Sequence, residues 1–162
     1  LESDYRDMKM EDVDISKILE NLYTVYAPVA DDKKIEFIKD IPETIHITGN
    51  RDRLLQVFVN IISNAFKYTD DGGRISMKLY EKHSSVTCQI EDNGIGIDEH
   101  DLPFIFNRFY RGDESRSRET GGAGIGLSIA KAVISAHGGD IKVESKKGEG
   151  TKISIMLPSK NK

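Results

Sequence analysis

The chain has 162 residues, the length of one ordinary domain, and 38% of them are hydrophobic, which is enough to form a core. It carries 23 basic and 27 acidic residues, a formal net charge of -4, which excludes the basic surplus typical of non-specific nucleic-acid binders. The single cysteine, Cys88, excludes an internal disulfide and a cysteine-rich zinc site, and it favours a reducing, cytoplasmic setting. No apolar run approaches the ~20 residues that span a bilayer. Any anionic ligand must therefore be held by local groups.

Hydrophobic periodicity predicts the helices and strands, and Gly, Pro and Asp residues mark their ends. In chain order the predicted elements are a helix from Asp14–Ser16 (Asp14 or Ser16 as cap) to Pro28–Asp32, strands Ile35–Ile38 and Ile45–Ile47, a helix Arg51–Tyr68, strands Ile75–Tyr80 and Val86–Ile90, a short helix near Leu102–Phe106, a helix Gly124–His137, and strands Asp140–Ser145 and Thr151–Leu157. The segment 92–123 breaks the pattern and is expected to be mostly a long mobile loop, and loops of that length are usually functional. The sequence predicts an α+β fold, a two-layer sandwich in which about three helices cover a mixed, mostly antiparallel sheet of about five strands.

The helix Arg51–Tyr68 carries an unusual polar face. At ~100° per residue its polar side chains fall on one arc: Gln56, Asn60, Ser63, Asn64 and Lys67. A solvated face is usually rich in Lys and Glu, whereas amide oxygens can coordinate Mg²⁺ without adding charge. Asn64 and Lys67, one turn apart, are therefore candidates to hold a metal and a phosphate. The alternative is an ordinary amphipathic helix with a solvated face.

Two glycine-rich segments lie about 28 residues apart, one at Gly94–Gly96 after an apolar strand and one at Gly122–Leu127 opening a helix. The N–H groups and dipole of a helix N-terminus favour phosphate. Neither segment matches a Walker A loop or a dinucleotide fingerprint. Asp92, at the end of the strand, is a candidate acceptor for the exocyclic amine of adenine. A guanine carbonyl there would leave the carboxylate unpaired, so this position would select ATP over GTP.

Together these segments resemble the catalytic, ATP-binding domain of bacterial sensor histidine kinases, whose Bergerat-type nucleotide fold is shared with DNA gyrase and related ATPases. The similar segments are Asn60–Thr69 (N box), Asp92–Ile97 (first glycine box), Phe104–Arg111 (F box), Gly122–Leu127 (second glycine box) and Gly148–Thr151 (last glycine box). The resemblance runs from about Glu11 to Pro158, nearly the whole chain. It implies ATP and Mg²⁺ as cofactors and an ATP lid. It also implies a cytoplasmic domain of a parent protein anchored in the bacterial inner membrane.

The resemblance assigns roles residue by residue. Asn64, with Asn60 nearby, would coordinate Mg²⁺, and Lys67 and Tyr68 would meet phosphate and ribose. Asp92 would take the adenine amine. The other expected nucleotide-binding residues are Gly94, Gly96, Ile97 and Thr151 around the base, Phe109 and Arg111 in the lid, and Gly122, Gly124, Ile125, Gly126 and Leu127 around the phosphates. Asn60, Lys67 and Arg111 are the expected catalytic residues, and Ala123 replaces the family's usual Thr or Ser.

The implied activity is transfer of the γ-phosphoryl of ATP to a histidine of a separate dimerisation domain, and from there to an aspartate of a response regulator. None of the four histidines here has the setting of such an acceptor, so each is expected to be structural or solvent-exposed: His46, His83, His100 and His137. Residues 1–10 are then expected to be a remnant of the dimerisation helix or linker, and residues 11–162 the catalytic domain, a monomer without nucleic-acid partners. A hydrolytic ATPase of the same fold and a non-catalytic nucleotide-binding module are the alternatives. Asn60 disfavours hydrolysis, because an amide cannot accept a proton from water.

Overall fold

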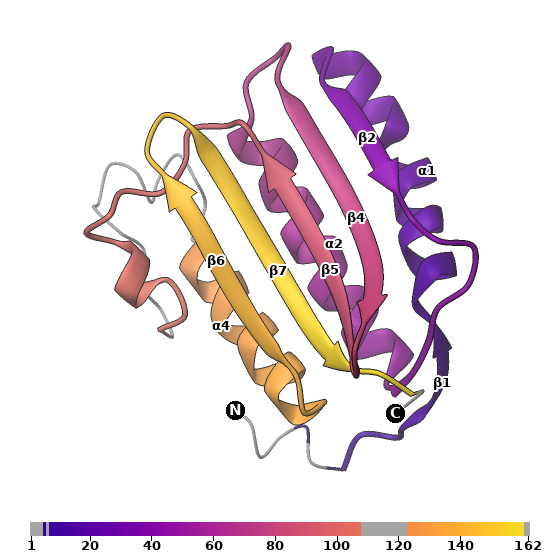
Figure 1. Ribbon diagram of the computed structural model, residues 1–162. Helices are drawn as coiled ribbons and strands as arrows, with labels where there is room; N and C mark the ends of the chain where they lie inside the picture. The colour runs from indigo at the N-terminus through magenta and orange to yellow at the C-terminus, as the bar shows by residue number, and fades with distance from the viewer. Residues whose placement is uncertain (1–4, 6, 108–122, 161–162) are drawn as a thin grey trace.

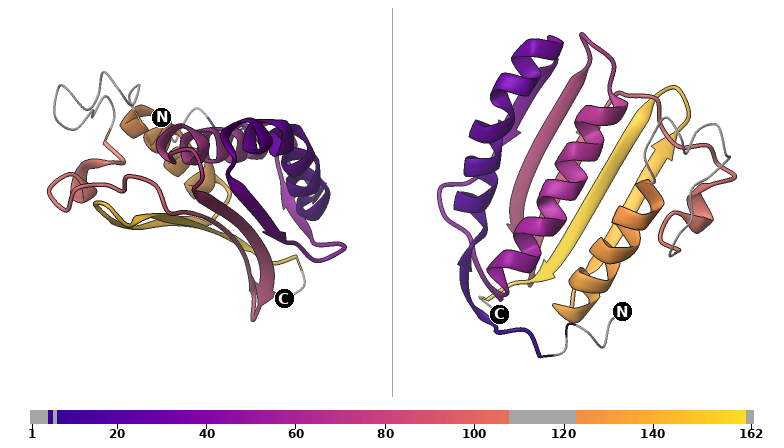
Figure 2. Two further views of the ribbon diagram at one scale, coloured as in Figure 1. Left: turned by 90° about the horizontal axis from the view of Figure 1, so that it is seen from above. Right: turned by 180° about the vertical axis from the view of Figure 1, so that it is seen from behind.

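The computed structural model describes residues 5, 7–107 and 123–160 of the chain. In that part, three α-helices lie on one face of a five-stranded sheet, as Figures 1 and 2 show. The helices are α1 (Ile15–Lys33), α2 (Arg51–Tyr68) and α4 (Ala123–Ala136). The strands are β1 (Glu11–Asp14), β2 (Glu36–Asp40), β3 (His46–Gly49), β4 (Arg74–Lys82), β5 (Ser85–Asp92), β6 (Asp140–Lys146) and β7 (Gly150–Pro158), and Leu102–Phe104 forms the short 3₁₀ helix η2. The predicted α+β two-layer sandwich is confirmed.

The sheet is mixed, in the strand order β2-β4-β5-β7-β6. The last four of these strands pair antiparallel, whereas β2 pairs parallel with β4. β1 and β3 form a separate antiparallel ribbon. The sequence predicted β2 and β3 as strands but indicated no partners for them, and it missed β1, whose only apolar residue is Val13.

Several predicted boundaries were wrong by a few residues. The first helix continues through Pro28 to Lys33, and its cap is Asp14, whose Oδ1 accepts the N–H of Lys17 at 3.0 Å. The predicted strands are shifted or lengthened by up to two residues at each end, because ladder hydrogen bonds continue where the side chains become polar. The short helix ends at Phe104, and α4 begins at Ala123 and ends at Ala136, one residue before the predicted end.

The core lies between the sheet and the helices. α2 occupies its centre, and its inward side chains are buried: Leu54, Val57, Phe58, Ile61, Ile62, Ala65 and Phe66. In the strands, alternate side chains face the helices, as at Val86, Cys88 and Ile90 of β5. No helix in the described part of the chain is long and apolar enough to cross a membrane.

Candidate functional site

The core ends in a polar row at one end of the sheet. Asp92 of β5 lies opposite Thr151 of β7, and Thr151 lies opposite Ser145 of β6. Directly opposed residues in antiparallel strands project to the same side. Since Ile90 and Ile153, two residues away on β5 and β7, are buried, this row faces the helices. The polar side chains therefore continue the inner face of the sheet where its apolar residues stop.

The Asp92 carboxyl group is partly withdrawn from water. Burial raises its pKa to about 6, and the charge of Glu91 adds to this, whereas the backbone N–H groups of Gly94 and Thr151 act to lower it. The Gly94 N–H donates to Asp92 Oδ1 at 2.8 Å. At neutral pH the group is still ionised and has lost part of its water. A neutral donor such as an amine would replace that water favourably.

The loop after Asp92 is wedged between α2 and the turn that joins β6 to β7. The Ile95 N–H donates to the Tyr68 carbonyl at 3.1 Å, and the Gly148 N–H donates to the Ile95 carbonyl at 2.7 Å. A Cβ on Gly96, whose φ is +71°, would lie 2.1 Å from the Lys146 carbonyl oxygen. A side chain at this position would therefore strain the backbone and force the loop away from the turn.

Ser145 connects this loop to the hairpin of β6 and β7. Its Oγ accepts the Ile97 N–H at 2.8 Å and donates to the Gly150 carbonyl at 2.9 Å, and it lies 2.8 Å from Thr151 Oγ1. Ser145 was not among the predicted site residues. Its signal was a small polar residue on the inner side of β6, two positions after the half-buried Val143, just before the turn.

The structure divides the predicted polar face of α2. Asn60 and Asn64 are half-buried on one face at a spacing of four residues, and Lys67 is exposed. Ser63, in contrast, joins the contact with α1, because its Oγ lies 2.6 Å from the Tyr26 hydroxyl. Ser63 therefore packs where α2 meets α1.

The C-terminal end of α2 is closed by a residue from α1. Lys33 Nζ donates to the carbonyls of Phe66 and Thr69 at 2.6 and 3.1 Å. A cation at a helix C-terminus is favourable and satisfies carbonyls that the helix leaves unpaired. This contact steadies the helix end beside Tyr68, and no sequence pattern indicated it.

The other predicted residues divide into three groups. Leu127 is buried in α4, and Gly124, Ile125 and Gly126 belong to the start of that helix, which lies toward the same end of the molecule as the C-terminus of α2 (Figure 2). Phe109, Arg111 and Gly122 lie outside the described residues. Of the F box, Phe106 lies against α4, with Lys131 Nζ 5.0 Å from its ring centroid.

Clusters of at least three His, Cys, Asp or Glu residues that could hold a metal ion are absent from the part of the chain that the structure describes. The predicted magnesium ligands, Asn60 and Asn64, are amides and belong to a different donor class. Amide and water oxygens are acceptable ligands for Mg²⁺, which often keeps waters and substrate phosphates in its shell. The magnesium site stays a prediction.

His137 has a structural role, as expected. Its Nδ1 donates to the Val133 carbonyl at 2.8 Å, and its Nε2 accepts the Asn50 N–H at 3.0 Å. Burial lowers the pKa of this imidazole below 6.5, against the hydrogen bond to Val133. The ring is therefore a neutral bridge between the last turn of α4 and the residue that caps α2.

Comparison with known proteins identifies the family. Residues 49–161 match the family described as "Histidine kinase-, DNA gyrase B-, and HSP90-like ATPase". The chain belongs to this family. Over 132 residues it is 42% identical to the sensor histidine kinase WalK of Bacillus subtilis (strain 168), a match that spans 80% of this chain and 22% of WalK.

Solved structures agree with the family assignment. The catalytic domain of the histidine kinase ThkA superimposes with a TM-score of 0.81 at 24% identity, over 94% of this chain and 97% of that one. Full-length ShkA in complex with AMPPNP gives a TM-score of 0.77 at 26% identity, over 94% of this chain and 32% of ShkA. The prediction of a histidine-kinase-type catalytic domain is thus confirmed at the level of family and fold.

Proposed function

We propose that this chain binds Mg-ATP and is the catalytic domain of a sensor histidine kinase. In this proposal it directs the γ-phosphoryl group of ATP to a histidine on the dimerisation domain of the same kinase, which passes it to an aspartate of a response regulator. The main support for nucleotide binding is the setting of Asp92. It is a half-buried carboxylate at the end of β5, with a raised pKa and a glycine loop beside it. The family of the chain and the AMPPNP complex of ShkA support it.

Adenine recognition fits the groups at the glycine loop. An ionised Asp92 accepts a hydrogen bond from the exocyclic amine, and its partial burial makes an unpaired alternative costly. Gly94 and Gly96 carry no side chains, so the loop packs directly against the carbonyls of Tyr68 and Lys146, which fixes its backbone beside Asp92. Ile97 and Thr151, on either side of the Ser145 hydroxyl, complete the proposed base-binding residues.

Phosphate and metal binding are proposed for α2, the lid and the start of α4. Mg²⁺ would neutralise charge on the phosphates when bound. Asn64 and Asn60 would supply amide oxygens to it, and Lys67 and Tyr68 would contact phosphate and ribose. The remaining proposed residues are Phe109 and Arg111 of the lid and Gly122, Gly124, Ile125, Gly126 and Leu127. The N-terminal N–H groups of α4 suit an anion.

In the proposed reaction, an imidazole nitrogen of the acceptor histidine forms a bond to the γ-phosphorus. The bond from that phosphorus to its bridging oxygen breaks, and the electron pair leaves with ADP. Because the imidazole is itself the nucleophile, this chain needs no general base; it positions the phosphates and offsets their charge. The Asn60 amide cannot take a proton from water, which disfavours the hydrolytic alternative.

Nucleotide binding is tested by calorimetric titration of the chain with ATP, with and without Mg²⁺. We expect saturable binding that Mg²⁺ strengthens, and weaker Mg²⁺ dependence in Asn64→Ala. Gln56→Ala, an exposed polar residue of the same helix, is the matched control and should titrate like the unmodified chain. Absence of ATP binding would refute the proposal.

Phosphoryl transfer is tested by mixing the chain with a histidine-bearing dimerisation fragment and γ-labelled ATP. Transfer of label to the fragment, lost when its acceptor histidine is replaced, is the expected result. Steady release of inorganic phosphate that Asn60→Ala abolishes would favour the hydrolytic ATPase. ATP binding without label on any cognate fragment and without hydrolysis would favour a non-catalytic module.

We also propose that residues 1–10 belong to a dimerisation helix or linker, and that residues 11–162 act as a monomeric cytoplasmic domain of a membrane-anchored kinase. The support is indirect: the match spans only 22% of WalK, so most of that relative lies outside it. Sedimentation equilibrium of the chain with and without ATP tests whether it is a monomer, because a dimer would give twice the molar mass.

A further inference from the structure

The hydroxyl groups of Ser145 and Thr151 form a hydrogen-bond chain with a fixed direction. A serine hydroxyl has one proton and two lone pairs. The proton of Ser145 goes to the Gly150 carbonyl at 2.9 Å, and one lone pair accepts the Ile97 N–H at 2.8 Å. Thr151 Oγ1 lies 2.8 Å from the same oxygen. Because the Ser145 proton is already used in the bond to Gly150, the Thr151 hydroxyl must be the donor in this contact. It donates to the remaining lone pair of Ser145 Oγ.

This direction leaves the Thr151 hydroxyl with lone pairs and no proton to offer. Its neighbour across the β5–β7 ladder is Asp92, which when ionised also offers only lone pairs. The two side chains project to the same side of the sheet. Asp92 and Thr151 therefore form an edge of the candidate site that accepts hydrogen bonds and donates none.

We propose that Ser145 is a positioning residue that fixes Thr151 as an acceptor, so that the Asp92–Thr151 edge selects a 6-amino purine nucleotide over a 6-oxo purine nucleotide. This inference rests on the proposed nucleotide site and adds a specificity residue that does not itself touch the base. The amino group of adenine supplies two N–H donors. The carbonyl of a 6-oxo purine supplies none, and opposite acceptors it is left unpaired.

A merely structural role for Ser145 makes a different prediction. If the hydroxyl only tied the Gly94–Ile97 loop to the hairpin, its loss would loosen the loop and weaken all purine nucleotides alike. If it directs the Thr151 proton, its loss frees Thr151 to donate to a carbonyl, and discrimination falls. The ratio of the dissociation constants for ITP and ATP separates the two roles, because these nucleotides differ in the 6-position group and in protonation of the adjacent N1.

The test measures this ratio by titration at pH 7.5, where Asp92 is ionised, for the unmodified chain, Ser145→Ala, Ser145→Thr and Ser76→Ala. We expect Ser145→Ala to lower the ratio by about tenfold, the size set by one unpaired buried polar group. Ser145→Thr keeps a hydroxyl and should keep the ratio. Ser76 follows the buried Ile75 on β4 and faces the opposite side of the sheet, so its variant should also keep it.

An unchanged ratio in Ser145→Ala, with ATP still bound, would overturn the role of Ser145 and leave the proposed function intact. Failure of the unmodified chain to bind ATP would overturn both. If Ser145→Ala does not fold, Thr151→Val tests the same claim, because it removes the acceptor and keeps the bonds of Ser145 to Ile97 and Gly150. The ratio should fall there too, and an unchanged ratio would overturn the inference.

Discussion

The two ends of the sheet are held together in contrasting ways. At the glycine end, formed by Asp92–Ile97, Ser145 and Gly150–Thr151, backbone groups and hydroxyls bond directly, and Cβ atoms on Gly96 and Gly150 would lie 2.1 and 2.0 Å from carbonyl oxygens. At the opposite end, called the termini end below, the ribbon of β1 and β3 meets the C-terminal residues (Figure 1). There, Asp12 Oδ2 lies 2.8 Å from His46 Nδ1, and its Oδ1 lies 2.5 Å from Lys160 Nζ.

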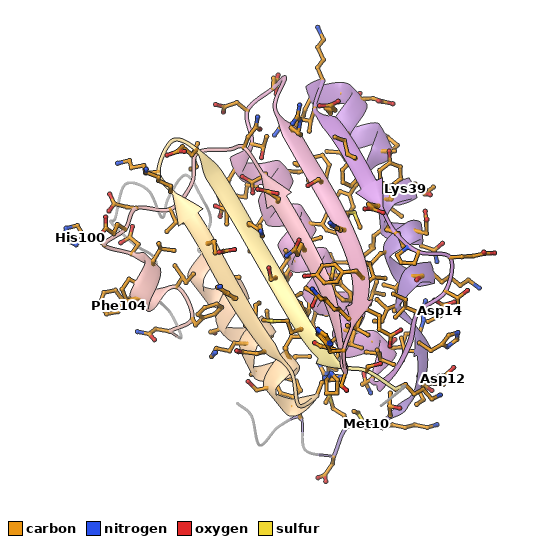
Figure 3. All side chains as sticks on the ribbon, viewed as in Figure 1. Met10, Asp12, Asp14, Lys39, His100 and Phe104 are labelled. Carbon is orange, nitrogen blue, oxygen red and sulfur yellow. The ribbon has the colours of Figure 1, made fainter. Side chains whose placement is uncertain are left out.

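This difference indicates which end of the sheet tolerates substitutions. The side chains of Asp12, His46 and Lys160 are 41 to 50% exposed, and Figure 3 shows Asp12 projecting outward from the ribbon. Exposed ion pairs of this kind contribute little to stability and weaken with salt. The glycine end has no such freedom, since its atoms are in contact on several sides. The residues proposed to bind nucleotide therefore lie on the more constrained end.

Gly96→Ala is expected to give the largest loss of stability and so to test how constrained the glycine end is. The positive φ costs about 1 kcal/mol, and overpacking against Lys146 adds roughly 2 kcal/mol. Gly72→Ala is the matched control, because Gly72 also has a positive φ, +84°, but its Cβ would meet nothing within 4 Å. Urea unfolding should show a loss of about 3 kcal/mol for Gly96→Ala and about 1 kcal/mol for the control. Equal losses of stability in the two variants would show that the loop around Gly96 is not tightly packed.

His137→Ala is expected to destabilise the chain although it lies at the termini end, because this histidine is buried there. Losing its two hydrogen bonds should lower the free energy of unfolding by about 2 kcal/mol at pH 7.5. The folded-state pKa is lowered, so the unfolded chain binds the proton first as pH falls. The contribution of His137 is thus complete above its unfolded pKa of 6.5 and is lost as pH falls through the folded pKa.

Urea unfolding of His137→Ala and of the exposed control His100→Ala at pH 7.5 and pH 5.5 checks this prediction. The difference between the His137 variant and the unmodified chain should shrink at the lower pH. The His100 variant should follow the unmodified chain at both. A difference for His137 that grows on acidification would show that the imidazole is stabilised in its charged form.

Adenosine binding should depend on the ionisation of Asp92. The pKa of this group is raised to about 6, so the carboxylate gains a proton as pH falls through that value. A protonated carboxyl has lost one acceptor for the adenine amine. We expect affinity to fall by about tenfold between pH 7.5 and pH 5, the effect of one lost hydrogen bond to a charged group. Adenosine is the probe because it has no phosphate to titrate, and pH-independent affinity would argue against the contact.

Asp12→Asn should have the smallest effect, because both of its ion pairs are exposed. Lys160 and His46 lower the pKa of Asp12 through their hydrogen bonds, so what it contributes is present at neutral pH and lost in acid. The melting temperature of Asp12→Asn should lie just below that of the unmodified chain at low salt and coincide with it at high salt. A large, salt-independent drop would mean that the two ends are held equally firmly.

The sequence predicted best where the pattern is local. The bounds of α2 were predicted correctly, because its apolar face is strong and Asp70–Gly73 end it clearly. Pairings that depend on distant partners were not predicted, such as the parallel contact of β2 with β4 and the whole of β1. At the site, motifs located Asp92 and the glycine loop, but Ser145 has no motif, and its contacts with Ile97, Gly150 and Thr151 form only on folding. For Ser63, the helical angle alone does not reveal that its hydroxyl pairs with that of Tyr26 on α1.

Calorimetric titration of Asp92→Asn with Mg-ATP tests whether the Asp92 carboxylate binds the adenine base. The asparagine keeps an oxygen for the Gly94 N–H, so circular dichroism and urea unfolding should show an intact fold. Its ATP affinity should be at least about thirtyfold below that of the unmodified chain, since a partly buried charged acceptor is lost. An intact variant that binds ATP as tightly as the unmodified chain would show that Asp92 does not bind the adenine base.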